Sequence, residues 1–68
     1  MGKYEKLWKY LKDTCLSTER LSFDEIYAIC GAHVDHDFMN SKRELERYGL
    51  SVMKIDMNSR TVLFSRNA

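Results

Sequence analysis

Two helix-like segments followed by two strand-like segments occupy the second half of the sequence. LSFDEIYAICG has the capping pattern of a short helix, and HDFMNSKRELERYGL is an amphipathic segment that ends at a glycine. SVMKIDMNSRTVLFSR then alternates apolar and polar residues around a polar turn, as a β-hairpin does. Together with a helix near the N-terminus, this order predicts an α+β chain of three helices followed by a C-terminal antiparallel two-stranded β-hairpin.

The size and composition of the chain exclude several classes of protein. Its 68 residues are enough for one domain, 1–68, around one core. Hydrophobic residues make up 44% and charged residues 31%, which argues against both a disordered chain and a membrane protein. The N-terminus MGKYEKLWKY lacks the apolar centre of a signal peptide, and no apolar run is long enough to span a bilayer. We therefore expect a cytoplasmic protein.

The first helix is predicted over residues 3–12, and a polar connection over 13–21 follows it. Four lysines, spaced three residues apart, sweep around the helix and form most of its solvated face. In the connection, Leu16 is the expected inward anchor. The apolar stripe of the helix repeats at intervals of three and four residues, and its members are Tyr4, Leu7, Trp8 and Leu11.

The second helix has clear start and stop signals. Ser22 and Glu25 form a capping box, and Leu21 and Ile26 occupy the two positions of a hydrophobic staple. Gly31 provides the left-handed residue that ends the helix. The residues expected on its buried face are Phe23, Ile26, Tyr27 and Cys30, with Ile29 at the border.

The third helix is predicted from an N-cap at Asp35 or Asp37 to Tyr48, with Gly49 as its stop. At about 100° per residue, one set of side chains faces the core and a second set clusters about 140° to 200° away from Phe38. The inner set is Phe38, Ser41, Leu45 and Tyr48. The outer set is His36, Asn40, Arg43 and Arg47.

The hairpin is expected to turn at Asn58 and Ser59, which would place Arg60 near its tip and point Lys54 and Thr61 outward. In that register the facing pairs are Met57 with Arg60, Ile55 with Val62, and Met53 with Phe64. The side chains expected to cover the core are Met53, Ile55, Val62 and Phe64.

This arrangement predicts a winged helix-turn-helix domain that binds duplex DNA in a regulatory or accessory role. Asn and Arg make bidentate contacts with base edges, and basic side chains also reach phosphates. We assign His36, Asn40, Arg43 and Arg47 to the major groove. Lys54 and Arg60 are assigned to phosphates. The alternative is a non-enzymatic module that contacts a protein partner, or a second copy of itself, through Tyr10 and Met39.

Other chemistry finds little support in the sequence. Cys15 and Cys30 have no Cys-x-x-Cys spacing, and we expect a buried thiol at Cys30. Cys30, His33 and His36 repeat every three residues, which keeps open a weaker alternative, a metal-responsive regulator, although the spacing fits no zinc-finger pattern. No catalytic residues, cofactor or small-molecule substrate are predicted, because the chain has no phosphate loop, oxyanion loop or paired carboxylates.

The motifs also carry a family resemblance. YEKLWKYL, LSFDEI, ERYGLSV and IDMNSRTVLFSR resemble the conserved segments of a family of small, uncharacterised bacterial domains. Members have a longer tryptophan-rich insertion before the third helix, where this chain has only AHVDHD, and the resemblance implies no activity. The spacing from Gly31 to Gly49 is also similar to that of winged-helix regulators. The matched positions are Tyr4, Leu7, Tyr10, Leu11, Leu21, Phe23, Glu25, Ile26, Gly49, Leu50, Val52, Ile55, Asp56, Val62, Phe64 and Arg66.

Overall fold

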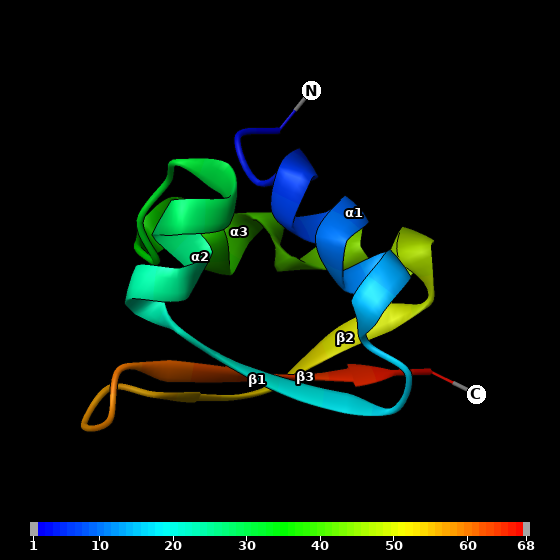
Figure 1. The fold of residues 1–68 in the computed structure, drawn as a ribbon. Helices are drawn as coiled ribbons and strands as arrows, with labels where there is room; N and C mark the ends of the chain where they lie inside the picture. Colours follow the sequence, from blue (N-terminus) through cyan, green and yellow to red (C-terminus); the bar gives the residue numbers. More distant parts are fainter. Residues whose placement is uncertain (1, 68) are drawn as a thin grey trace.

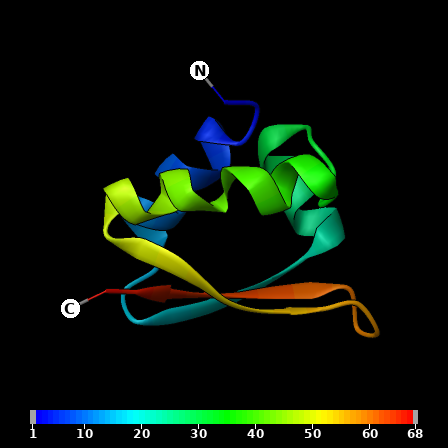
Figure 2. The same ribbon diagram turned by 180° about the vertical axis from the view of Figure 1, so that it is seen from behind.

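The computed structural model describes residues 2–67 and shows an α+β domain with a three-stranded antiparallel sheet (Figure 1). The helices pack on one face of the sheet, and no described element covers the other face (Figures 1 and 2). In chain order the elements are α1 (Glu5–Thr14), β1 (Thr18–Ser22), α2 (Phe23–Cys30), α3 (His36–Leu45), a 3₁₀ turn η1 (Glu46–Tyr48), β2 (Leu50–Asp56) and β3 (Thr61–Arg66).

The predicted winged helix-turn-helix order, three helices and then a two-stranded hairpin, is wrong. Residues 13–21 were expected to be a polar connection, yet they contain most of β1, which pairs with β3 and gives the strand order β1-β3-β2. The sequence TERLS carries one buried apolar side chain, Leu21, so it has no alternation that would reveal a strand. Its pairing partner lies about forty residues further along the chain, outside any local pattern.

The first helix spans Glu5–Thr14 instead of residues 3–12, and its later end changes which side chain follows it into the core. Cys15 is fully buried, whereas Leu16, the predicted anchor, is 83% exposed. Cys15 continues the apolar stripe one turn beyond Leu11. The Arg66 guanidinium donates to the carbonyls of Cys15 at 2.7 Å and Lys12 at 2.6 Å, so β3 provides hydrogen-bond partners for the end of α1.

The capping signals are confirmed. Ser22 Oγ accepts from the Glu25 amide at 3.0 Å, and Glu25 Oε1 accepts from the Ser22 amide at 2.8 Å. Asp35 caps α3, and left-handed glycines follow α2 and η1, with φ of 75° at Gly31 and 78° at Gly49. The prediction that Tyr27 is buried is wrong, because its ring is exposed and stacks on the His33 ring, with centroids 4.5 Å apart.

The hairpin forms, but its register departs from the prediction at two places. Ile55 faces Val62 as expected, whereas Phe64 faces Val52 instead of Met53. A bulge at Met53 turns that side chain outward, to 62% exposure. The predicted Met57–Arg60 pair is absent from the ladder, which closes at Asp56 and Thr61.

The loop that connects β2 and β3 is therefore four residues long. Asp56 Oδ1 accepts from the amides of Asn58 at 2.9 Å and Ser59 at 3.2 Å, and Arg60 adopts a left-handed φ of 56°. An aspartate that satisfies turn amides in this way favours a longer loop over a two-residue turn.

The core lies between the helices and the sheet. Tyr4, just before α1, packs edge-on against Phe38 of α3 with ring centroids 5.3 Å apart, and Trp8 contacts the same ring at 5.9 Å. The fully buried large side chains are Trp8, Tyr4, Phe38, Phe64, Leu7, Leu11, Ile26, Leu45, Leu50, Val62 and Cys15.

Candidate nucleic-acid interface

The third helix presents the polar face that its sequence predicts. Phe38 and Leu45 are fully buried and fix the rotation of the helix about its axis. As a result, the four predicted outer residues, His36, Asn40, Arg43 and Arg47, are all exposed along α3 and η1. Figure 2 shows α3 crossing the front of the helical layer, with no other described element in front of it. We call these four side chains the α3 face.

The two acidic side chains of α3 contact the N-terminal part of the chain. Asp37 Oδ2 pairs with Lys3 Nζ at 2.6 Å, and this hydrogen bond raises the pKa of Lys3. Glu44 Oε1 accepts from the Trp8 indole N–H at 3.2 Å. Both carboxylates therefore lie on the side of α3 that faces Lys3 and α1. Arg47 lines a depression on that side together with Glu5 and Glu44. Glu46 remains exposed and reduces the positive potential near Arg47.

A hydrogen-bond network anchors the N-terminus of α3. The Tyr4 hydroxyl donates to the His33 carbonyl at 2.7 Å and to Asp35 Oδ1 at 3.1 Å. Asp35 also accepts from the Asp37 amide at 3.0 Å. Partial desolvation raises the pKa of Asp35, but hydrogen bonds from Tyr4, Asp37 and Phe38 and the charge of Lys3 together lower it below its usual value. Burial, followed by the bond to Asp35, raises the pKa of Tyr4.

Arg60 lies at the end of the hairpin, next to the start of α2. Its carbonyl accepts from the Phe23 amide at 2.9 Å, and its guanidinium carbon lies 5.8 Å from the centre of the Phe23 ring. The side chain is exposed. This cation–π contact holds one side of the guanidinium against the Phe23 ring and leaves its N–H groups available to an anion.

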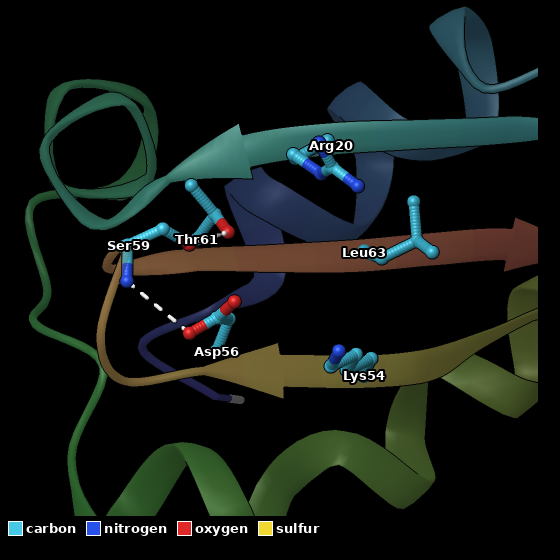
Figure 3. Close-up of a pocket in the computed structure, with 6 residues that line it drawn as sticks. All are labelled: Arg20, Lys54, Asp56, Ser59, Thr61 and Leu63. Atoms are coloured by element: carbon cyan, nitrogen blue, oxygen red, sulfur yellow. Dashed lines mark hydrogen bonds between the residues drawn. The ribbon is translucent and has the colours of Figure 1, made fainter.

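Lys54 does not lie with the α3 face. It is on the open face of the sheet, where Arg20 of β1 and Leu63 of β3 occupy the same cross-strand row (Figure 3). Its outward orientation was predicted, but its separation from the other site residues was not. Arg20 was not identified from the sequence, because only the pairing of β1 with β3 brings it next to Lys54.

The remaining candidate residues are distributed over several elements. Tyr10 on α1 and Met39 on α3 are both exposed. The Cys30 thiol lies 3.2 Å from the Ile26 carbonyl oxygen, and Cys15 is buried, which raises its pKa. Within residues 2–67, no three His, Cys, Asp or Glu side chains are grouped closely enough to hold a metal ion.

No protein-family model matches the chain, and no curated protein or solved structure has significant similarity to it. The family resemblance of the motifs therefore stays a prediction. Among the described residues, no helix combines the length and the apolar character needed to cross a membrane.

Proposed function

We propose that this domain binds duplex DNA through the α3 face, with His36, Asn40, Arg43 and Arg47 directed to the major groove. The observation that supports this function is the segregation of charge on one helix. Four hydrogen-bonding side chains are exposed along α3 and η1, while Asp37 pairs with Lys3 and Glu44 accepts from Trp8 of α1. Arg47 is the member of this set that also lines a depression with Glu44. An α-helix fits the major groove, and exposed Asn and Arg side chains have the donor geometry for adenine and guanine edges.

The net charge of +1 limits the strength of this interaction. Nonspecific affinity comes mainly from phosphate neutralisation, so a domain with few basic contacts binds weakly and loses affinity readily when salt is added. Such a module fits a regulatory or accessory role in which a second contact adds affinity. Arg60, exposed at the hairpin end, is a candidate for one such phosphate contact.

The proposal is tested by fluorescence anisotropy with a labelled duplex of mixed sequence over a series of salt concentrations. We expect binding at low salt that weakens steeply as salt rises, by about 0.9 in log–log slope for each phosphate contact. The double variant Arg43→Ala/Arg47→Ala should lower the affinity at least about tenfold, given a loss of about 1–3 kcal/mol per base contact.

A charge-matched control is available on α1. Lys6→Ala/Lys9→Ala removes two exposed positive charges from a helix that does not contribute to the α3 face. This control should bind DNA nearly as well as the unmodified protein. Equal losses in the two double variants would show a general charge effect and reject the α3 face, and absence of duplex binding at low salt would reject the function.

A further inference from the structure

The open face of the sheet carries a row of three side chains that the helices do not contact. Arg20 on β1, Leu63 on β3 and Lys54 on β2 are cross-strand neighbours. The adjacent row, Leu21, Val62 and Ile55, packs toward the helices. Because side chains alternate between the faces of a sheet, the Arg20–Leu63–Lys54 row points away from the core.

This row borders a depression of about 240 Å³ near the hairpin end (Figure 3). Arg20 and Lys54 lie on opposite sides of Leu63, and the hydroxyls of Ser59 and Thr61 lie 2.8 Å from each other at one end. Leu63 is half-buried although no described element covers it. The lining therefore consists of two cations, two hydroxyls and the Asp56 carboxylate around the Leu63 side chain.

Asp56 is the one acidic side chain in this lining, and its carboxylate is engaged by the turn. Hydrogen bonding from the Ser59 amide is the largest cause that lowers the pKa of Asp56, and the Asn58 amide acts in the same direction. The charge of Lys54 lowers it further. Asp56 Oδ1 accepts from the turn amides, and the ammonium of Lys54 and the guanidinium of Arg20 remain as donors to an outside anion. With two cations and one carboxylate, the lining keeps a net charge of +1.

We propose that Arg20 and Lys54 form a second phosphate-contacting surface, and that its occupant is the sugar–phosphate backbone of nucleic acid. Arg, Lys, Ser and Thr are the side chains that proteins use to contact backbone phosphates, and all four types line this depression. The inference rests on the proposed function, because it assigns the same class of ligand to a second face. The two surfaces are separate, since the α3 face lies on the helical side of the sheet.

The first test compares Arg20→Gln/Lys54→Gln with the charge-matched Lys6→Gln/Lys9→Gln in the anisotropy assay. Glutamine retains part of the aliphatic stem beside Leu63, so folding should be preserved, and circular dichroism checks this. We expect Arg20→Gln/Lys54→Gln to lower the affinity for duplex about threefold to tenfold. The variant should also reduce the log–log slope of affinity against salt by about 1 to 2, while the control changes neither quantity. Identical curves for the two variants would overturn the proposal.

A second measurement separates this inference from the α3 assignment. Amide NMR spectra of the Arg43→Ala/Arg47→Ala variant, titrated with the same duplex at low salt, should still shift at residues 18–22 and 54–63. Shifts there with none on α3 would support the sheet surface even if the α3 assignment failed. Shifts confined to α3 in the unmodified protein would overturn the inference and leave the proposed function intact. Saturation of the same amides by inorganic phosphate, without any response to duplex, would overturn the assignment to a nucleic-acid backbone.

Discussion

The Tyr4 hydroxyl donates to the Asp35 carboxylate at 3.1 Å, which joins the residue preceding α1 to the N-cap of α3. Asp35 uses the same oxygen, Oδ1, to accept from the Asp37 amide, so one carboxylate both starts α3 and receives the tyrosine. The Tyr4 ring meanwhile packs against Phe38. Placement of the α3 face therefore depends on contacts made by a residue that never touches a ligand in the proposed function.

Tyr4→Phe should destabilise the domain by about 1–2 kcal/mol. The variant keeps the ring packing but removes the hydroxyl that donates to the His33 carbonyl and the Asp35 carboxylate. Urea unfolding followed by circular dichroism measures this loss. Tyr10→Phe is the matched control, since Tyr10 is exposed, and it should change stability by less than about 0.5 kcal/mol. Equal effects at the two positions would show that the Tyr4 hydroxyl contributes nothing specific.

Stability should fall in acid, in part because of Asp35. Its pKa in the folded protein lies below the unfolded value of about 3.9, so its stabilising contribution is fully present above that value. The contribution is lost as the pH falls through the folded pKa. Asp56 has a lowered pKa as well and acts in the same direction.

Asp35→Asn keeps an oxygen that can cap α3 but removes the titrating charge. We expect this variant to lose less stability than the unmodified protein between neutral pH and about pH 3, with the difference appearing below about pH 4. Urea midpoints measured across this range provide the comparison. Parallel pH profiles for the two proteins would contradict a stabilising role for the Asp35 carboxylate.

Local signals in the sequence predicted local structure well. The Ser22–Glu25 capping box, the Gly31 stop and the Asp35 cap each involve residues within a few positions of one another, and each forms as expected. The third helix was predicted to run to Tyr48, but α3 ends at Leu45, and the left-handed Gly49 follows the 3₁₀ turn η1. The exposure of the α3 face also followed from local periodicity, because Phe38 and Leu45 determine which side of the helix is buried. These features depend on hydrogen bonds and packing that short segments specify themselves.

Features set by distant pairing could not be predicted in this way. β1 exists because β3 pairs with it, and its single buried residue, Leu21, was equally consistent with a helix staple. The bulge at Met53 depends on how β2 twists against β3, which alternation alone does not encode. The neighbourhood of Arg20 and Lys54 follows from the strand order, so that part of the candidate surface was found only in three dimensions.

Cys15 and Leu16 are adjacent in sequence, but Cys15 is fully buried and Leu16 is exposed. Substitution of each residue by alanine should therefore change stability by different amounts. Cys15→Ala removes a fully buried sulfur that continues the α1 stripe, and we expect a loss of about 1 kcal/mol or more from lost packing. Leu16→Ala removes a larger side chain that is 83% exposed, so its effect should stay within about 0.5 kcal/mol. Urea unfolding of both variants under reducing conditions measures the difference. If Leu16→Ala proved the more damaging, α1 would have to end before Cys15 with Leu16 turned into the core, and the Arg66 contact at that helix end would be lost with it.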